Sequence, residues 1–571
     1  MFKDHPRGLI VAFFANMGER FGFYTMMAIL VLFLQAKFGL PADTAGWIYG
    51  VFYFLIYALA LVGGLIADRT QNYKGTILTG IVVMFLGYVL LALPGMGLPF
   101  ALVGLFTIAF GNGLFKGNLQ ALVGQMYDDP KYSHLRDSAF SLFYMGINIG
   151  AVFAPNAARG VRTWYLGSHG LGYDADLPAL CHQFLAGDLK NVAQLQELAN
   201  KVTGTQVADL QAFVTNYIEV FSTGYNYAFG VAAVAMLVSL ATYVFFKRFL
   251  PDRRAQAAQG AATVKIPWEQ EKRRLVALGL VFLVVIFFWM SFHQNGLTLT
   301  FFARDYTLKQ VDPLSFLAFD IKGLLLIASV IAGIVLLIQR GTLLRRLLGV
   351  GLAAAGGGLL WLLYGTYGPT NTVEPEIFQQ FNPYFVVFLT PVVVGLFAWL
   401  RARGKEPSTP RKIGIGMLLA AVAFTLMVVS SLDLPSPASL GGQPSTDRVS
   451  PSWLISTYLI LTIAELFLSP MGISFVSKVA PPRFQGLMQG GWLGATALGN
   501  QLLVVGSMMW VRFEVWQVWA TFVVCCLVSA AFIFSIVKRL EAATATSGPA
   551  APPAPEGEGE PQPPAATSQP A

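Results

Sequence analysis

Long apolar stretches separated by short polar connections run along most of the chain. In windows of roughly 20 residues, the length of a helix that crosses a bilayer, this pattern predicts about fourteen transmembrane helices. We expect an all-α polytopic membrane protein. The predicted spans are residues 8–36, 44–67, 75–93, 98–126, 138–157, 223–247, 274–302, 314–338, 343–366, 381–401, 411–431, 452–479, 486–510 and 515–538.

Polar residues interrupt the first apolar stretch. Asn16, Glu19 and Arg20 are spaced i, i+3 and i+4, which places them on one face of a helix. A charge near the bilayer centre costs about 2.5–3.5 kcal/mol on insertion scales, so it persists where it faces a bundle interior or a polar cavity. These three residues predict a polar site inside the membrane and favour a transporter.

Composition and charge agree with a membrane protein. The chain has 571 residues, of which 55% are hydrophobic and 12% charged, with a mean hydropathy of +0.60. With the N-terminus inside, about two thirds of the 38 Lys and Arg residues fall in cytoplasmic segments, as the positive-inside rule requires. The net charge of +8 therefore reflects membrane orientation and does not indicate nucleic-acid binding. We expect both termini in the cytoplasm.

Some segments are more polar than the spans. Residues 158–222 predict a periplasmic helical insertion, because apolar positions from about 188 to 220 have helical spacing. Residues 248–273 predict a cytoplasmic linker. The tail, 541–571, is rich in Ala, Pro, Gly and Glu and predicts disorder. Three cysteines are too few for a disulfide framework, and we interpret them as packing thiols.

A short connection between the second and third predicted spans carries Gly63, Gly64, Asp68 and Arg69. Small residues allow close helix approach, and charges at a helix end can form a gating network. The motif resembles the loop signature of the major facilitator superfamily. It makes Asp68 and Arg69 candidate gating-loop residues.

Further motifs resemble the proton-dependent oligopeptide transporter family, and they occur in the family's order along nearly the whole apolar chain. We interpret the protein as a member of this family. The matching segments are Gly111–Asn118, Phe143–Gly150, Phe381–Pro383, Glu465–Gly472, Arg483–Met488 and Trp492–Asn500.

The resemblance implies a major facilitator fold, with two six-helix bundles plus two extra helices. Because the seventh-helix block Phe288–Gln294 precedes Asn382 by some ninety residues, the extra pair is expected between core helices seven and eight. The expected organisation is 1–157 (helices 1–5), 158–222 (insertion), 223–247 (helix 6), 248–273 (linker), 274–302 (helix 7), 303–380 (inserted pair with loops), 381–540 (helices 8–12) and 541–571 (tail).

The resemblance also assigns roles in peptide binding. Glu465 is expected to bind the peptide ammonium group, helped by Asn148, Asn382 and Ser469. Tyr24, Tyr57 and Trp492 are expected to line the side-chain pockets. For these aromatic residues, ordinary packing remains the alternative.

Proton coupling is expected at Glu19, Arg20 and Lys116. In the family, the lysine that matches Lys116 interacts with the first-helix glutamates. We therefore expect a Lys116–Glu19 pair that opens when a proton or a substrate carboxylate arrives. A purely structural bridge is the alternative.

The chain departs from the family pattern at several positions. Asn16 and Phe23 replace a Glu and a Tyr, and Met27 replaces a base that helps to bind the substrate carboxylate. His293 replaces the seventh-helix acid. Because histidine titrates near pH 6.5, it could take over the proton role, or it could be a hydrogen-bonded structural group.

The leading hypothesis is a proton-coupled symporter that imports di- and tripeptides across a bacterial inner membrane. It would act as a monomer in the lipid bilayer, with no cofactor or metal besides the coupled proton. A transporter of another small solute, an uncoupled facilitator and a solute sensor remain alternatives. The sequence contains no nucleotide loop, metal-ligand cluster or nucleophile–base pair, so an enzyme is not expected.

Overall fold

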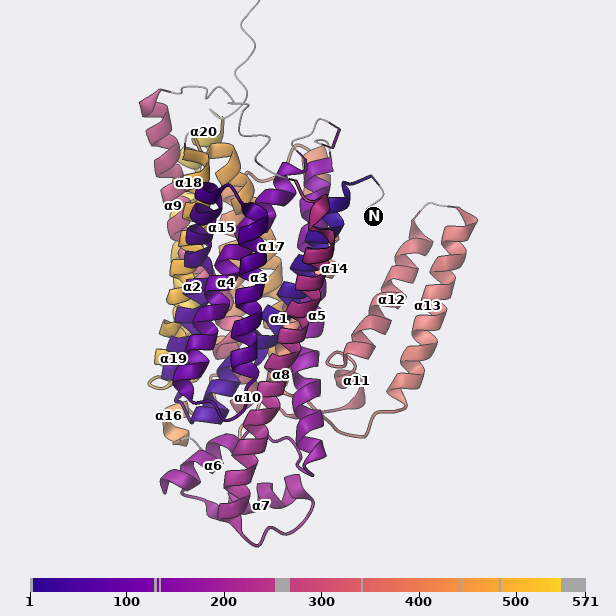
Figure 1. Ribbon diagram of the computed structural model, residues 1–571, viewed down its shortest axis with the longest axis vertical. Helices are drawn as coiled ribbons and strands as arrows, with labels where there is room; N and C mark the ends of the chain where they lie inside the picture. The colour runs from indigo at the N-terminus through magenta and orange to yellow at the C-terminus, as the bar shows by residue number, and fades with distance from the viewer. Residues whose placement is uncertain are drawn as a thin grey trace, which may run out of the picture.

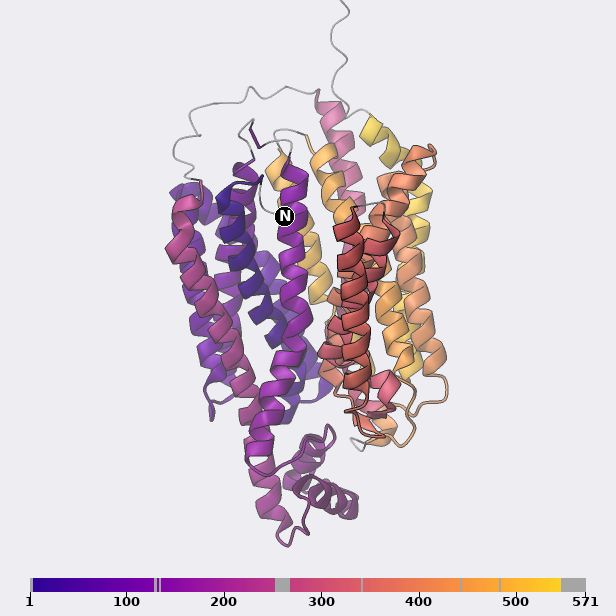
Figure 2. The same ribbon diagram turned by 90° about the vertical axis from the view of Figure 1, so that its right-hand side faces the viewer.

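The computed structural model describes residues 4–127, 131–132, 135–251, 267–339, 342–441, 444–481 and 484–545. These residues form two helical bundles side by side (Figures 1 and 2). The first bundle contains α1 (Arg7–Phe38), α2 (Ala42–Thr70), α3 (Tyr73–Ala92), α4 (Leu98–Gln125), α5 (Arg136–Ser168) and α8 (Leu210–Phe246), which ends in the turn η2 (Lys247–Phe249).

The second bundle begins with a helix in three pieces, α9 (Trp268–Phe292), η4 (His293–Gly296) and α10 (Thr298–Asp305). Its other helices are η5 (Pro375–Gln380) with α14 (Phe381–Ala402), α15 (Thr409–Ser430), α17 (Ser452–Val479), α18 (Gln485–Gln501), α19 (Val504–Trp510) and α20 (Val515–Ala545). Short connections contain α11 (Pro313–Phe316), α16 (Pro437–Leu440) and the strands β1 (Gln310–Val311) and β2 (Asn371–Thr372), which pair antiparallel.

Twelve helical segments of the described chain are long and apolar enough to cross a membrane. The fourteen predicted spans include two more, at 138–157 and 486–510. The first corresponds to α5, which carries Asn148, Asn156 and Arg162 along its length. The second is interrupted, because α18 has only 17 residues and α19 follows after a break. Both helices nevertheless run beside the others in the bundles (Figure 1).

The additional helices α12 (Ile321–Ile338) and α13 (Leu343–Tyr364) lie between α10 and α14 in the chain. They form a hairpin that stands beside the bundles (Figure 1). The two helices approach closely at glycines, since a Cβ atom on Gly333 would lie 2.6 Å from the Ala353 backbone nitrogen. Their other faces expose large apolar side chains, as expected of a surface in lipid.

The segment between α5 and α8 is shorter than the predicted insertion. Residues 158–168 continue α5, and α8 already begins at Leu210. The stretch from about 188 to 220, in which apolar residues have helical spacing, belongs to two helices, because α7 (Val192–Thr203) ends at Gly204, which has a φ of +69°. We call residues 169–209, which include α6 (Leu177–Ala186) and α7, the cap.

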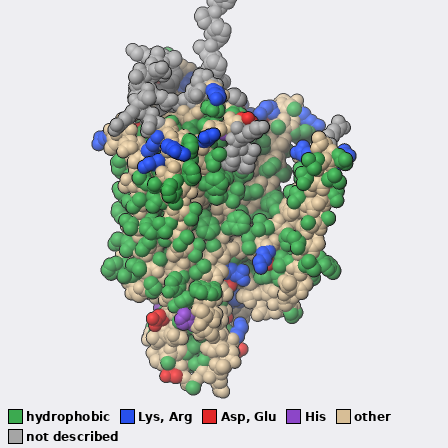
Figure 3. Space-filling view, turned by 45° about the vertical axis from the view of Figure 1, so that its right-hand side comes forward, with side chains coloured by type: hydrophobic (Ala, Val, Ile, Leu, Met, Phe, Trp, Pro, Cys, Tyr) green, Lys and Arg blue, Asp and Glu red, His purple; other side chains and the backbone are tan. Residues whose placement is uncertain are grey.

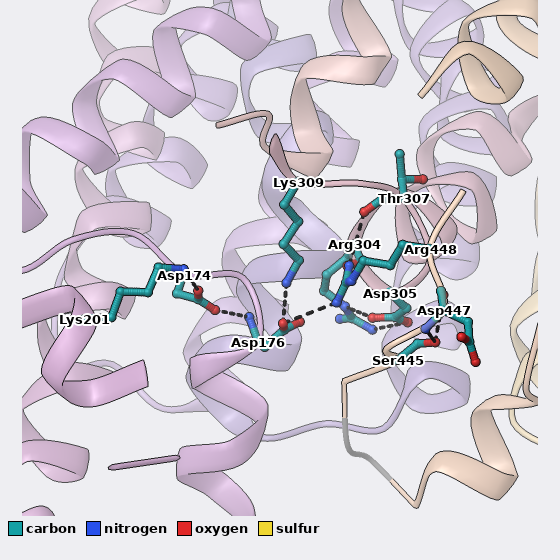
Figure 4. Close-up of polar contacts among 10 residues, drawn as sticks. All are labelled: Asp174, Asp176, Lys201, Arg304, Asp305, Thr307, Lys309, Ser445, Asp447 and Arg448. Carbon is teal, nitrogen blue, oxygen red and sulfur yellow. Dashed lines mark hydrogen bonds and ion pairs between the residues drawn. The ribbon is translucent and has the colours of Figure 1, made fainter. Parts of the chain in front are cut away.

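The cap lies at one end of the molecule and defines the cap side (Figure 1). Its residue Asp176 forms ion pairs with Lys309 and Arg448, which belong to loops of the second bundle (Figure 4). Asp174 pairs with Lys201 inside the cap, at 3.6 Å. Cys181 is buried in α6. The cap therefore contacts both bundles.

The opposite end carries the N-terminus and the end of α20, and we call it the tail side (Figure 1). Apolar side chains cover the middle of the surface, and Lys and Arg side chains gather at the tail side (Figure 3). The predicted linker 248–273 is helical from Trp268 onward, and its residues 252–266 lie outside the described residues. The predicted tail begins within α20, and residues 546–571 are likewise not described.

Neighbouring glycines in the 63–69 motif test the packing of α2 on α4. A Cβ atom on Gly63 would lie 2.1 Å from the Gly113 carbonyl oxygen, whereas one on Gly64 would meet nothing within 4 Å. We expect Gly63→Ala to destabilise the protein by about 1–3 kcal/mol, because backbone must move to admit the methyl group. Gly64→Ala is the control. Thermal unfolding in detergent measures both, and equal stability of the two variants would contradict this packing.

Candidate functional site

The charged residues of the first helix form a buried cluster. Arg20 donates from Nε to Glu19 Oε2 at 2.5 Å and from Nη2 to Glu19 Oε1 at 2.6 Å. Asn112 on α4 donates to the same Oε1 at 2.7 Å. Glu19 and Arg20 are 0% and 4% exposed. The guanidinium also lies 4.6 Å from the ring centroid of Phe23. Both charges are thus satisfied within the first bundle.

Lys116 lies one turn after Asn112 on α4, but its contact differs from the expected one. The Lys116 ammonium lies over the ring of Tyr57 on α2, 4.2 Å from its centroid. The Glu19 carboxylate is instead held by Arg20 and Asn112. Lys116 interacts electrostatically with Glu19 and Arg20 without forming the direct ion pair that the sequence led us to expect. This leaves the Lys116 ammonium against an aromatic face, a placement that suits a cation in a site of low polarity.

The second bundle contributes a buried carboxylate. Glu465 on α17 is 9% exposed and accepts a hydrogen bond from Asn382 Nδ2 at 2.9 Å. Asn382, at the start of α14, also donates to Thr462 at 3.1 Å. Ser469 is half-buried one turn after Glu465 on the same helix. An amide hydrogen bond leaves the Glu465 carboxylate able to accept a further donor.

Tyrosines connect the polar groups of the two bundles. Tyr24 on α1 interacts electrostatically with Arg20, Tyr57 and Glu465. Tyr144 on α5 likewise interacts with Glu465, Tyr24 and Tyr57. Tyr24, Tyr57, Tyr144 and Glu465 are thus near enough to one another for a charge on one to affect the others.

Two other predicted residues make contacts mainly with their own bundle. Asn148 donates to the carbonyl of Tyr144 on its own helix at 3.0 Å. Trp492 is 5% exposed, and a Cβ atom on Gly472 would lie 1.9 Å from its Cη2 atom. The Trp492 ring therefore packs directly on α17, which agrees with ordinary packing, the alternative given for this residue.

His293 lies where the seventh core helix is broken. It begins the turn η4, and its Nδ1 atom is 2.5 Å from Asn500 Oδ1 on α18. Its ring stacks on Trp289, with centroids 4.7 Å apart, and meets the edge of Tyr53 from the first bundle at 4.6 Å. His293 is thus enclosed by aromatic rings and one amide.

Asp68 and Arg69 lie in the last turn of α2, on the tail side and away from these groups. The Tyr73 hydroxyl donates to the Asp68 carboxylate, and Gln71 takes the left-handed conformation with a φ of 51°. The chain thereby turns sharply from α2 into α3. The motif shapes this connection.

Sequence reasoning did not assign several residues to the site. Asn112 and Tyr144 precede Lys116 and Asn148 by one helical turn, and Asn500 lies in a quoted motif. Their spacing from assigned residues was the available signal, because side chains four apart share a helix face. Tyr53, one turn before Tyr57, could have been found in the same way.

Paired helical bundles with polar side chains at their interface are typical of secondary transporters. A sequence profile described as the POT family matches residues 74–268 and 363–518, which is more than half of the chain. The chain therefore belongs to the POT family, the proton-dependent oligopeptide transporters of the major facilitator superfamily. It is a transporter and not an enzyme. Helices α1 and α2 and the helices from α9 to α12 lie outside the matched stretches.

Similar proteins cover nearly the whole chain. The peptide transporter YePEPT of Yersinia enterocolitica is 28% identical over 87% of this chain and 87% of its own. Dipeptide and tripeptide permease A of Erwinia pyrifoliae is 26% identical over 87% of this chain and 84% of its own. The solved structure of a POT family transporter in complex with 5-aminolevulinic acid has a TM-score of 0.64 at 21% identity, covering 95% of this chain and 98% of its own. The likeness to this solved structure shows the fold.

The hydrogen bond from Asn112 to Glu19 tests the first cluster. We expect Asn112→Ala to lower the free energy of unfolding by about 1–3 kcal/mol, because a buried carboxylate loses a donor. Gln120→Ala, on an exposed position of the same helix, is the control. Thermal unfolding in detergent compares the two. An Asn112→Ala protein as stable as the control would show that Arg20 alone satisfies Glu19.

Proposed function

We propose that this protein is a proton-coupled symporter that imports di- and tripeptides by alternating access. The observation that carries the proposal is a fixed charge of each sign on the two bundles, the Glu465 carboxylate held by Asn382 in one and the Lys116 ammonium over the Tyr57 ring in the other. A short peptide is a zwitterion, so it needs one fixed charge of each sign for its two ends.

In the proposed complex, Glu465 binds the peptide ammonium group, with Asn382, Asn148 and Ser469 as polar neighbours. Lys116 binds the carboxylate. Tyr24, Tyr57 and Trp492 form the walls for the variable side chains, where flat aromatic surfaces accept many shapes. Asp68 and Arg69 act in the gate on the tail side.

Glu19, Arg20, Lys116 and His293 are the proposed proton-coupling residues of this central site. A substrate carboxylate that binds Lys116 draws the ammonium away from the Tyr57 ring and changes its interaction with Glu19 and Arg20. His293 can respond to the same change through its contact with Tyr53, which precedes Tyr57 by one turn.

Transport of a different small solute is the second candidate. Met27, which is 3% exposed, stands where the family has a base, so Lys116 is the cation proposed for the substrate carboxylate. A relative of the same fold is described in complex with 5-aminolevulinic acid, which also carries one amine and one carboxylate. If transport is not coupled to protons, the protein is a facilitator, and the uptake experiment below distinguishes this case from symport.

The relatives are bacterial proteins, and we propose the inner membrane as the location. By the positive-inside rule, the concentration of Lys and Arg at the tail side supports an orientation with both termini in the cytoplasm and the cap outside. A single copy supplies all the proposed binding residues, so a monomer is sufficient for transport.

Uptake of labelled dialanine into proteoliposomes tests this function. We expect an inward proton gradient to stimulate uptake, because the substrate and the proton enter together. Glu465→Gln and Lys116→Ala should each abolish gradient-driven uptake, since each removes one of the two charges that hold the zwitterion. Glu197→Gln, an exposed carboxylate in the cap, is the matched control.

The outcomes separate the candidates. Uptake that ignores the gradient would indicate a facilitator. Absence of uptake in folded protein, together with uptake of another amine–carboxylate solute, would replace the peptide as cargo. Normal uptake by both variants would exclude the proposed binding site.

A further inference from the structure

A second buried charge cluster joins the two bundles at the cap side, far along α5 from the tail side. Arg162 on α5 is 0% exposed and forms ion pairs with Glu374 and Glu376, which precede and begin η5 of the second bundle. Arg159, one turn earlier, pairs with Glu374 at 3.1 Å. The cluster therefore places two cations of one bundle against two anions of the other.

The surroundings of this cluster are closed and largely aromatic. The Arg162 guanidinium lies 3.9 Å from the ring centroid of Tyr173 in the cap, and its Nη1 is 3.3 Å from the hydroxyl of Tyr225 on α8. Glu374 and Glu376 are 3% and 0% exposed. The titratable and charged groups that face the two carboxylates are Arg159, Arg162, Tyr173 and Tyr225. Opposite charges thus balance in the closed arrangement.

One oxygen of the cluster is unused. Glu376 Oε1 accepts from Arg162, but Oε2 is buried and has no hydrogen-bond partner among the described residues. Buried polar atoms are nearly always paired, so such an atom needs an explanation. A carboxylate oxygen without a donor is a position where a proton can bind.

We propose that Glu374 and Glu376 form a proton-binding site at the cap-side junction, and that proton binding there releases Arg162 and favours separation of the bundles on this side. This site adds a second position for the proton in the proposed symport. It rests on the proposed function in one respect, since it assumes that the two bundles separate at the cap side. It is distinct from Glu19, Lys116 and His293, which belong to the central site.

The physical reason is linkage between proton binding and separation. While the junction is closed, Arg159 and Arg162 stabilise both carboxylates in the ionised form. If α5 moves away, the two carboxylates remain two residues apart with no cation, and their repulsion is relieved by taking up one proton. Opening also admits water, which relieves the burial that opposes ionisation of Glu376 in the closed state. Where the loss of both cations outweighs this entry of water, the open state binds the proton more tightly, and a lower pH favours the open state by the same factor.

Other hydrogen bonds join the two bundles next to this cluster, but they involve neutral groups. Asn156 on α5 donates to Gln380 of η5 at 2.6 Å, and Gln379 donates to the carbonyl of Ala28 on α1 at 3.3 Å. These neutral hydrogen bonds also join the bundles but do not titrate. Between α5 and η5, the carboxylates of the cluster are therefore the pH-sensitive groups.

A reporter cysteine measures opening of the cap side without any substrate. Ser507 on α19 is 0% exposed and packs against α2, since a Cβ atom on Gly46 would lie 2.0 Å from its Oγ. We would place Ser507→Cys in a protein whose Cys181, Cys525 and Cys526 are changed to Ala. Labelling by a polar maleimide in lipid nanodiscs is normalised at each pH to the denatured protein, which removes the pH dependence of the reagent.

We expect labelling of the reporter protein to rise as the pH falls from 7.5 to 5.5, by less than the roughly hundredfold that one linked proton allows over two pH units. In Glu376→Gln the neutral side chain imitates the protonated acid, so labelling should already be high at pH 7.5 and change little with pH. Glu374→Gln provides a second test if the first variant does not fold. Glu197→Gln should retain the full pH dependence of the reporter protein.

Labelling that does not depend on pH in the reporter protein would overturn this site, as would an unchanged pH dependence in the two Gln variants. If peptides are not the substrate, the two experiments together give a different result. A protein that does not take up dialanine but opens with pH through Glu374 and Glu376 would keep the proton site and lose the peptide assignment.

Discussion

The structure depends on one constraint, which is that an ionised or polar side chain inside a membrane protein must find its partner within the protein. Glu19 is satisfied by Arg20 and Asn112, Glu465 by Asn382, and Arg162 by Glu374 and Glu376. Arg20 lies beside Glu19 on α1, whereas Asn112, Asn382, Glu374 and Glu376 each join one helix to another and so fix how the helices lie. The polar residues of the apolar helices therefore define the arrangement of the fold as well as its candidate chemistry.

These contacts fall into two groups with different consequences. The hydrogen bonds of Glu19, Glu465 and His293 are made within one bundle, so a movement of one bundle against the other leaves them intact. The contacts of Arg162 and Asn156 connect different bundles, so the same movement must break them. A transporter whose bundles move as rigid units needs this division, because each half of the site keeps its geometry while the junction changes.

Much of the fold could be predicted because apolar length and helical spacing are local properties of a sequence. The spans were found to within several residues, except where a helix is broken or extended by tertiary contacts. Thus α5 continues to Ser168, beyond the predicted span at 157, because Arg159 and Arg162 are neutralised by residues more than two hundred positions away. No local pattern contains that information.

The sequence names candidate site residues, whose roles stay predictions, but it does not give their pairings. The motifs identified Glu19, Lys116, Asn382 and Glu465, and the structure brings Asn382 and Glu465 into contact. The expected Lys116–Glu19 pair was wrong as a direct contact, because Arg20 is adjacent to Glu19 and long enough to reach it with two donors. A residue-by-residue resemblance names the groups in a site, whereas the choice among several possible partners depends on distances that only the folded chain sets.

The breaks in two core helices show the same constraint acting on the backbone. Between α9 and α10, and between α18 and α19, the regular helical hydrogen bonds are interrupted. Gln294 donates to the carbonyls of Met290 and Leu503, at 3.2 Å each, and the Tyr458 hydroxyl donates to the carbonyl of Asn295 at 2.7 Å. Side chains thus replace the donors that these carbonyls lack, which is the condition for irregular backbone at membrane depth. The polar residue Gln294, which has no evident purpose in an apolar sequence, is explained by the interruptions that it stabilises.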